Sequence, residues 1–445
     1  MMRLAVIFES SPFDRKGLFN AVHNRVKHLL ATGECTVDVF CVHSRDNAFT
    51  RRVRHTPAAP SVDEVVVDGI RYRLLWYRFS ILDNVLLEKL HVRPLLFRRF
   101  MDSHVGLLKG YDAVVAHSFC GGLFALAANE RYGVPYYVTW HGSDVHSHPW
   151  RVPVILEDTR AVMESARCNF FVSNALLETS EMITSHARKE VLYNGVSEDF
   201  VKYSPEDHTA VRERYGLAPE DKVVAFVGNL SAVKNVLSLP AIFAQVARRF
   251  AEVSISLSDS CGRSGCLKFW IVGDGKLRTQ LETACLESLT RHCEERSPSR
   301  HCEERSDVAI RFFGNQPSPV MPDIMNCIDV LVLPSLNEGL PLVCAEALSC
   351  GAAVVGSDAG GIAEVIGSDN AVPLVSPCDN AASQGAPSGR PYDDSFVNGM
   401  AEKVVAALTG QSPSQALPAE ISWSRTAALE LSILKSLKSR LHLTS

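Results

Sequence analysis

The chain has 445 residues, of which 46% are hydrophobic and 21% are charged, with a formal net charge of -5. This composition is typical of a soluble globular protein with two or three domains, and it excludes an intrinsically disordered chain. The slightly acidic balance gives no electrostatic reason to expect a nucleic acid partner.

The N-terminal sequence MMRLAVIFESSPFD contains an apolar run that Glu9 ends too early for a signal peptide. No later stretch approaches the roughly 18 apolar residues that a transmembrane helix requires. The 13 cysteines are odd in number and lie mostly within apolar runs, which favours reduced core residues over a disulfide framework. We therefore expect a cytoplasmic protein.

Short apolar runs alternate with amphipathic segments along the first part of the chain. The predicted strands lie near 3–8, 36–42, 112–117, 135–140 and 168–173. This alternation is typical of parallel βαβ units, in which a helix connects each strand to the next.

A polar stretch from about 193 to 208 interrupts this alternation, which then resumes. The later predicted strands are KVVAFV (222–227), KFWIV (268–272), DVLVLP (329–334) and AAVVG (352–356). We predict an α/β fold with two doubly wound, Rossmann-like domains, 1–200 and 201–420, facing across a cleft. Ligands of such sheets bind beyond the carboxyl ends of the strands, so the loops at these ends are the candidate sites.

Two segments break the pattern and are predicted to be surface insertions, near 288–308 and at 376–394. The first contains a tandem repeat, RHCEERSPS followed by RHCEERSDV, and the second is rich in small and turn-forming residues. The cysteines and histidines considered as zinc ligands are Cys261, Cys266, His292, Cys293, His301 and Cys302. Adjacent His-Cys pairs fit the usual ligand spacing poorly and duplication alone explains them, so we assign no metal site.

Two loops of the second domain contain candidate ligand-binding residues. In GNLSAVKN, after the strand at 222–227, Lys234 is a candidate cation, although a single loop lysine is often a solvated surface residue. In GDGKL, after the strand at 268–272, Gly273 and Gly275 would let the backbone approach a ligand closely. The third glycine of the dinucleotide-binding pattern is absent, which argues against an NAD or FAD enzyme.

The stretch NEGLPLVCAEALSCG (337–351) predicts an apolar helix from about Pro341 to Cys350, with Glu346 as its only charged residue. Such a helix is normally buried, and a buried carboxylate costs several kcal/mol unless it is hydrogen-bonded. The vicinal hydroxyls of a ribose would supply the missing donors. A neighbouring arginine or backbone group would instead give Glu346 a structural role.

The start of this predicted helix is a candidate anion site. Free N–H groups at Gly339, Leu340 and Leu342, together with the positive end of the helix dipole, would suit a phosphate. Glu338 lies at the mouth of that site. The combination favours a ligand in which hydroxyl-rich groups flank a phosphate.

These residues resemble a known family. The segments GNLSAVKN, IVGDGKLRTQLE and FFGNQPSPVMPDIMNCIDVLVLPSLNEGLPLVCAEALSCGAAVVGSDAGGIAEVIG resemble the C-terminal domain of retaining glycosyltransferases with the GT-B fold, family 4-like and group 1. The likeness covers about 220–367, and its most specific element is the E-x7-E pair of Glu338 and Glu346. In the first domain, HGSDV with His141 resembles the family's His-Gly-x-Asp loop, and Gly17 occupies the family's loop before its first helix.

The resemblance implies roles for these positions. Glu346 would bind the nucleotide ribose, Glu338 would contact the transferred sugar, and His141 would project toward the reacting sugar. The implied catalytic residues are His141, Lys234 and Glu338, and the implied nucleotide-binding residues are Gly17, Asn229, Gly273, Gly275, Gly339, Leu340 and Glu346. Asn229 stands where the family usually has an arginine, which leaves Lys234 as the one sure cation for a diphosphate.

The implied function is transfer of a sugar from a nucleoside diphosphate sugar to a hydroxyl of a glycan or lipid-linked acceptor, with retention of anomeric configuration. The first domain would be the acceptor side, with a terminal helix within 421–445 packing back on it. No cofactor and no metal are expected, because Lys234 and the helix N-terminus would stabilise the leaving diphosphate. The alternatives are a sugar-nucleotide epimerase of the same fold and a catalytically degenerate sugar-nucleotide binding module.

One segment bears on the acceptor. RYRLLWYRFSILDNVLLEKLHVRPLLFRRF (71–100) mixes seven basic residues with many aromatic and aliphatic ones. This composition would suit peripheral contact with the inner face of an anionic membrane. The same pattern also fits a pair of core-facing helices with a basic outer face.

Overall fold

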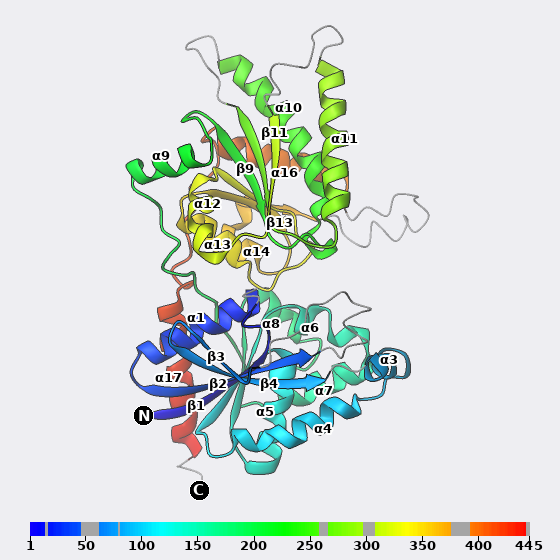
Figure 1. The fold of residues 1–445 in the computed structure, drawn as a ribbon, viewed down its shortest axis with the longest axis vertical. Helices are drawn as coiled ribbons and strands as arrows, with labels where there is room; N and C mark the ends of the chain where they lie inside the picture. The colour runs from blue at the N-terminus through cyan, green and yellow to red at the C-terminus, as the bar shows by residue number, and fades with distance from the viewer. Residues whose placement is uncertain are drawn as a thin grey trace. The chain divides into compact units, whose positions relative to one another are not determined.

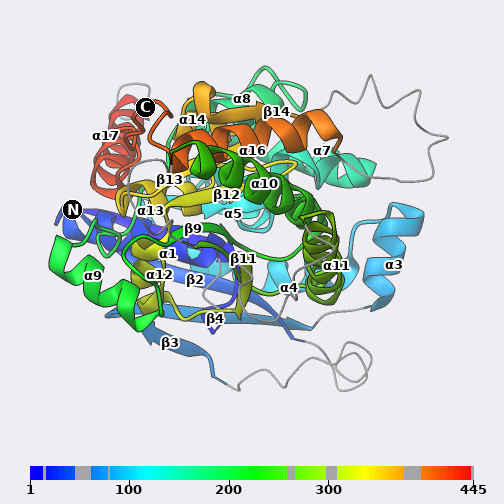
Figure 2. The ribbon, with the colours of Figure 1, turned by 90° about the horizontal axis from the view of Figure 1, so that it is seen from above.

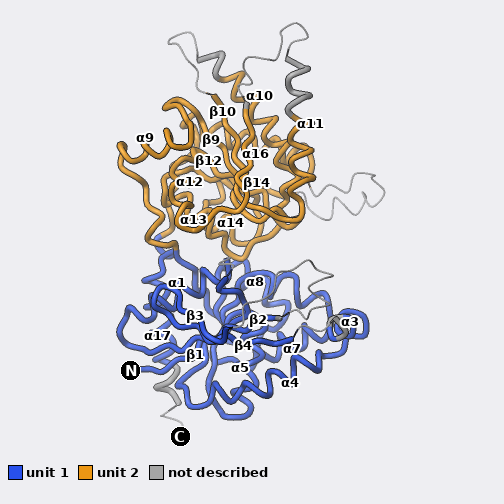
Figure 3. Tube along the Cα trace, viewed as in Figure 1, with its two compact units in different colours: residues 1–195, 419–445 blue, residues 196–418 orange. Residues whose placement is uncertain are grey.

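The computed structural model describes residues 1–13, 17–45, 62–78, 81–257, 266–296, 308–374 and 392–441. The chain divides into two compact units, one formed by 1–195 with 419–445 and the other by 196–418 (Figure 3). Each unit is an α/β structure with helices on both faces of a mainly parallel sheet (Figures 1 and 2). The prediction of two doubly wound, Rossmann-like domains is confirmed.

The described part of the first unit contains an eight-stranded sheet with the order β3-β4-β2-β1-β5-β6-β7-β8. The strands are β1 Met2–Glu9, β2 Cys35–Arg45, β3 Glu64–Val67, β4 Ile70–Arg78, β5 Ala113–His117, β6 Tyr136–Trp140, β7 Cys168–Phe171 and β8 Lys189–Val191. All neighbours pair in parallel except β3 and β4. The central strands are continuous apolar runs because both of their faces are covered.

Helices of the first unit follow the strands in sequence. They are α1 Gly17–Ala31, α3 Ile81–Leu90, α4 Leu95–His104, α5 Ser118–Tyr132, α6 Ser143–His146, α7 Pro153–Ser165, α8 Asn174–Ser180 and α17 Trp423–Leu441, with short 3-10 turns at Val105–Leu108 and Pro149–Arg151. The segment 71–100 is thus a strand followed by two helices, rather than a pair of helices. Within β4, burial alternates from Ile70 to Leu74, as expected of a strand with one covered face.

The described part of the second unit contains a six-stranded parallel sheet with the order β11-β10-β9-β12-β13-β14. Its strands are β9 Lys222–Val227, β10 Leu267–Val272, β11 Val308–Gly314, β12 Val330–Leu333, β13 Ala353–Asp358 and β14 Ala371–Pro373. Its helices are α9 Pro205–Arg214, α10 Leu239–Leu257, α11 Arg278–Arg296, α12 Met321–Cys327, α13 Leu342–Ser349, α14 Ile362–Ile366 and α16 Asp394–Leu408, with 3-10 turns at Ala232–Lys234, Val236–Ser238, Ser318–Val320 and Ser368–Asn370.

The two predicted insertions lie largely outside the described residues. Helix α11 continues to Arg296, so the beginning of the repeat is helical, whereas 297–307 and 375–391 are not described. Among the described residues there is no group of three or more His, Cys, Asp or Glu side chains that could hold a metal ion. No described helix combines the length and the apolar character needed to cross a membrane.

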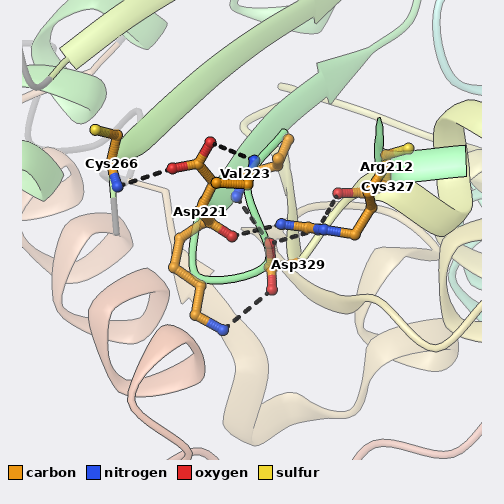
Figure 4. Close-up of polar contacts among 8 residues, drawn as sticks. Arg212, Asp221, Val223, Cys266, Cys327 and Asp329 are labelled. Atoms are coloured by element: carbon orange, nitrogen blue, oxygen red, sulfur yellow. Dashed lines mark hydrogen bonds and ion pairs between the residues drawn. The ribbon is translucent and has the colours of Figure 1, made fainter. Parts of the chain in front are cut away.

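A polar network joins helix α9 to the amino ends of the strands in the second unit (Figure 4). Arg212 donates to the carbonyl oxygens of Cys327 (3.0 Å) and Asp221 (2.5 Å) and lies 3.5 Å from the Asp329 carboxylate. The Asp221 carboxylate accepts a hydrogen bond from the backbone N–H of Cys266 (2.9 Å). These contacts satisfy polar groups at the edge of the sheet opposite the carboxyl ends of the strands.

A buried ion pair joins the last helix of the first unit to its first helix. Arg25 Nε on α1 lies 2.6 Å from Glu430 Oε2 on α17, and both side chains are fully buried. The remaining guanidinium nitrogens of Arg25 and Glu430 Oε1 have no hydrogen-bond partner among the residues that the structure describes. Such a pair contributes little net stability, but either charge alone in the same place is costly.

Glu430→Gln should therefore lower the free energy of unfolding by about 3–5 kcal/mol, because it leaves the Arg25 charge buried without a counter-charge. The double variant Arg25→Met/Glu430→Leu should recover most of this loss, because neither charge remains. Urea unfolding followed by circular dichroism measures both effects. If the single variant lost less than about 1 kcal/mol of unfolding free energy, the Arg25 charge would not depend on Glu430 as a counter-charge.

Candidate active site

The loops that follow β9, β12 and β13 converge at the carboxyl edge of the second sheet. Backbone N–H of Leu336, after β12, donates to the carbonyl oxygen of Val233, after β9 (2.8 Å). Backbone N–H of Gly361, after β13, donates to the carbonyl oxygen of Glu338 (3.1 Å). Gly360 has a φ of +56°, and a Cβ there would overlap the Glu338 carbonyl oxygen, so only glycine fits.

Lys234 and Glu338 meet at this edge. The Lys234 ammonium forms an ion pair with Glu338 Oε1, and Ser335 Oγ donates to the same oxygen at 2.7 Å. Lys234 is thus not a freely solvated surface lysine, because the fold directs it onto a partly buried carboxylate. An ammonium has three donors, so it can keep this carboxylate and still bind an anion.

The glycines after β10 have a structural function that the sequence interpretation missed. A Cβ on Gly273, whose φ is +129°, would overlap the carbonyl oxygen of Gly228, and one on Gly275 would overlap the carbonyl oxygen of Leu230. Both glycines therefore let the loops after β9 and β10 pack backbone against backbone. Asn229 lies between these contacts with an exposed side chain.

Helix α13 spans Leu342–Ser349, and Pro341 is its N-cap rather than its first helical residue. No side chain in the described part of the chain caps this end. Within the described residues, the backbone N–H groups of Gly339 and Leu340 donate no hydrogen bond. The first four backbone N–H groups of a helix have no partner within the helix, so this end can donate hydrogen bonds to an anion.

Glu346 on α13 has no hydrogen-bond or ion-pair partner for its carboxylate anywhere in the described parts of the chain, and burial alone raises its pKa to about 7. The helix is not buried on all sides as predicted, because Glu346 and Val343 are partly exposed while Cys344, Ala345 and Ala347 are buried. No structural contact therefore accounts for a carboxylate at this position. A ligand with hydroxyl donors would supply what it lacks.

His141 follows β6 in the first unit and is held at both its backbone and its ring. The buried Asp144 carboxylate accepts hydrogen bonds from the backbone N–H groups of His141 (3.2 Å) and Gly142 (2.8 Å). The ring Nε2 lies 3.0 Å from Nδ1 of His117, which ends β5. Burial, with the nearby Arg25 charge, lowers the pKa of His141 to about 3 and also holds the pKa of His117 well below its ordinary value.

Both rings are therefore neutral at pH 7, and one ring nitrogen donates while the other accepts. Sequence reasoning missed His117, although its place at the end of AVVAH is a usable signal. Parallel pairing of β5 with β6 sets His117 opposite Thr139, two residues before His141. Gly17 is the first residue of α1, and a Cβ there would meet nothing within 4 Å, so no contact among the residues that the structure describes explains it.

Comparison with known families follows the division into units. Residues 221–386 match the family described as Glycosyl transferases group 1, and residues 17–195 match the Glycosyl transferase 4-like domain. The chain belongs to the group 1 glycosyltransferases. The first match contains Lys234, Glu338 and Glu346, and the second contains His117 and His141.

Curated relatives of this glycosyltransferase are distant. It is 26% identical over 257 residues to the putative teichuronic acid biosynthesis glycosyltransferase TuaC of Bacillus subtilis, covering 58% of this chain and 55% of the relative. It is 26% identical over 267 residues to the D-inositol 3-phosphate glycosyltransferase of Mycobacterium ulcerans, covering 57% and 50%. The alignments thus span about half the length of these relatives.

Solved structures match the glycosyltransferase over nearly its full length. Sucrose-phosphate synthase from Thermosynechococcus elongatus has a TM-score of 0.64 and 15% identity, covering 99% of this chain and 100% of that one. HepE from Anabaena, in complex with UDP and glucose, has a TM-score of 0.59 and 16% identity, covering 98% and 100%. At these identities the likeness shows the GT-B fold.

Glu346→Gln should have opposite effects on stability and on ligand binding. A folded-state pKa near 7, above the ordinary 4.5, means that stability falls as pH rises from about 4.5 to 7, because ionisation is resisted only in the folded state. At pH 8 the free energy of unfolding of the variant should therefore exceed that of the wild type by about 1–3 kcal/mol. At pH 5 the two values should be nearly equal. The same change should weaken nucleoside diphosphate binding by roughly 1–3 kcal/mol.

Thermal unfolding at both pH values and calorimetry with UDP and GDP measure these effects. Glu220→Gln, at an exposed position of the same unit, controls for the lost charge. Earlier unfolding of Glu346→Gln together with normal nucleotide binding would contradict the assignment and indicate a structural carboxylate.

His117→Ala should lower turnover roughly 10- to 100-fold by releasing the His141 ring, while nucleoside diphosphate affinity stays unchanged. His117→Asn should retain most of the turnover, since its amide can replace Nδ1 in the bond to His141. Steady-state rates and calorimetry on both variants separate positioning from folding. Equal losses in both variants would contradict a role through this hydrogen bond.

Proposed function

We propose that this glycosyltransferase transfers a sugar from a nucleoside diphosphate sugar to a hydroxyl of a glycan or a lipid-linked acceptor, with retention of anomeric configuration. The observation that carries the proposal is the meeting of Lys234 and Glu338 at the sheet edge beside the uncapped start of α13, whose Glu346 has no partner among the described residues. The cation and the free N–H groups match a phosphate, and the unpartnered carboxylate matches the hydroxyls of a ribose. A single ligand that contains both groups would satisfy all of them. HepE, which shares the fold, has been solved with UDP and with UDP-glucose.

The leaving diphosphate is stabilised by Lys234 and by the backbone N–H groups of Gly339 and Leu340, so the reaction is proposed to need no metal. Asn229 brings no charge, and Arg278 does not replace the missing cation, because Asp274 (3.3 Å) and Glu282 (2.9 Å) engage it. Stabilisation of the developing charge therefore depends mainly on one ammonium and on oriented backbone dipoles.

Glu338 is proposed to accept hydrogen bonds from the transferred sugar, and Glu346 from the ribose. His141 is proposed to hydrogen-bond the reacting sugar as a neutral imidazole, which its lowered pKa ensures across the physiological range. Acceptor binding is assigned to the first unit. A neutral ring can donate or accept a hydrogen bond without introducing a charge beside the anomeric centre.

Glu338→Gln should lower turnover with the complete donor without weakening nucleoside diphosphate binding, because it removes a contact to the sugar and frees Lys234 from its ion pair. Calorimetry with the diphosphate and steady-state rates with UDP-, GDP- and ADP-sugars measure this, with Glu346→Gln as the contrasting variant. Weaker diphosphate binding by Glu338→Gln would contradict the assignment.

The same assay separates the alternatives. Transfer requires that nucleoside diphosphate release increases when an acceptor is supplied and continues in EDTA. Conversion of the donor without release would indicate an epimerase, and binding without either reaction would indicate a degenerate binding module. Release that stops in EDTA and returns with magnesium or manganese would overturn the metal-independent mechanism.

A further inference from the structure

Helices α3 and α4 of the first unit meet at a corner that presents large apolar side chains to solvent. The exposed fractions of Leu90, Val92, Leu95 and Leu96 are 66%, 43%, 57% and 46%. No residue of α4 is buried. Four neighbouring aliphatic side chains exposed in this way form a patch, unlike the scattered apolar residues of an ordinary surface.

The orientation of α4 is fixed by an aromatic cluster on its inner face. Phe97 and Phe100 pack against Tyr77, with ring centroids 5.3 and 5.6 Å away, and against Phe124, at 6.2 and 5.9 Å. Because residues three and four apart share a helix face, this packing directs positions 95, 98 and 99 outward. Leu96 flanks the inner face beside Phe100 and is nevertheless 46% exposed.

The corner itself is also held in place. Asp83 Oδ2 on α3 accepts a hydrogen bond from the backbone N–H of Leu96 (3.0 Å). Arg93 bridges the corner to α7, donating to Asp158 Oδ1 (2.9 Å) and to Glu157 Oε2 (3.3 Å). The apolar patch is therefore a preformed surface that folding leaves exposed.

Positive charge surrounds this patch. Lys89, Arg98 and Arg99 are exposed and form no ion pair within the described residues. Of the nearby acids, Asp83 binds the start of α4, Asp102 pairs with Arg131, and Glu157 and Asp158 pair with Arg93. Lys89, Arg98 and Arg99 therefore outnumber Glu88, the acid of the corner without an ion pair in the described chain.

We propose that the α3–α4 corner, defined by Leu90, Val92, Leu95, Leu96 and the cations Lys89, Arg98 and Arg99, docks the protein on an anionic lipid bilayer. Aliphatic side chains enter the boundary between headgroups and acyl chains, and the cations contact anionic headgroups. This narrows the membrane-contact interpretation of 71–100 to its last part, because β4 is part of the sheet. The inference does not depend on the proposed reaction.

The charges favour a bilayer over a second copy of this chain. A two-fold symmetric interface would bring this patch against its own copy, and Arg98 and Arg99 would face like charges. An anionic bilayer satisfies the apolar side chains and the cations together. It also offers a continuous surface to side chains from two helices and their connection.

Flotation of the full chain with liposomes tests the proposal. The protein should float with phosphatidylcholine vesicles that contain phosphatidylglycerol and remain behind with pure phosphatidylcholine. Binding should weaken as salt is raised, since the Debye length falls from about 10 Å at 0.1 M to about 3 Å at 1 M. No binding to anionic vesicles at low salt, or equal binding to both kinds of vesicle, would overturn the proposal.

Two double variants separate the two contributions. Arg98→Gln/Arg99→Gln should weaken binding to anionic vesicles roughly 25-fold, taking a factor of about five for each cation. Leu95→Ser/Leu96→Ser should weaken it by at least about ten-fold, since two leucines no longer enter the boundary. Melting temperatures should stay near the wild-type value, because all four side chains are exposed.

Met182→Ser and Lys27→Gln are matched controls, because they remove an exposed apolar side chain and an exposed cation elsewhere in the first unit. Both should bind vesicles like the wild type. Wild-type binding by the two double variants would overturn the proposal. Sedimentation showing a dimer that Leu95→Ser/Leu96→Ser dissociates would instead identify the corner as a contact between copies of the chain.

Discussion

Parallel strand pairing is the constraint on which the candidate site depends. In a parallel sheet every strand ends at the same edge, so residues distant in sequence meet there once the hydrogen-bond register is formed. This brings Lys234 to Glu338 across 104 residues and His117 to His141 across 24. Glycines such as Gly273 and Gly360 then allow the backbones of adjacent loops to approach closely. The strand pairing that forms the core therefore also brings the candidate site residues together.

Strands of the sheet centres could be predicted from sequence, because both faces are buried and the run is apolar throughout. The strands β3, β4, β8 and β14 could not, since they are short or alternate with exposed charges such as Arg71. Glu338 and Glu346 could be predicted as candidate site residues from the loop and the helix in which they stand. The position of His117 at a strand end could be seen in the sequence, but its contact with His141 could not, because the register of β5 and β6 creates it.

Three sets of fully or partly buried charged groups differ in how they are paired, and each kind of pairing indicates a different role. Arg25 and Glu430 neutralise one another in the core of the first unit, so their pairing concerns architecture. Lys234 and Glu338 are paired but partly accessible, so a ligand can share the ammonium. Glu346 has no counter-charge among the described residues, and burial raises its pKa. A ligand that donates hydrogen bonds to this carboxylate would therefore offset the cost of its burial. The charged groups in the core are thus paired with each other, whereas those at the candidate site are shared or have no partner among the described residues.

The position of α17 has a consequence for synthesis of the chain. Ala427, Leu431 and Leu434 of this helix belong to the same hydrophobic cluster as Phe8 and other residues of the first strands. Arg25 meets its counter-charge 405 residues later. At a translation rate of about 5–20 residues per second, roughly 20 to 80 seconds separate the two residues on the ribosome. Until then the first unit exposes part of its core, although its whole sheet has already been made.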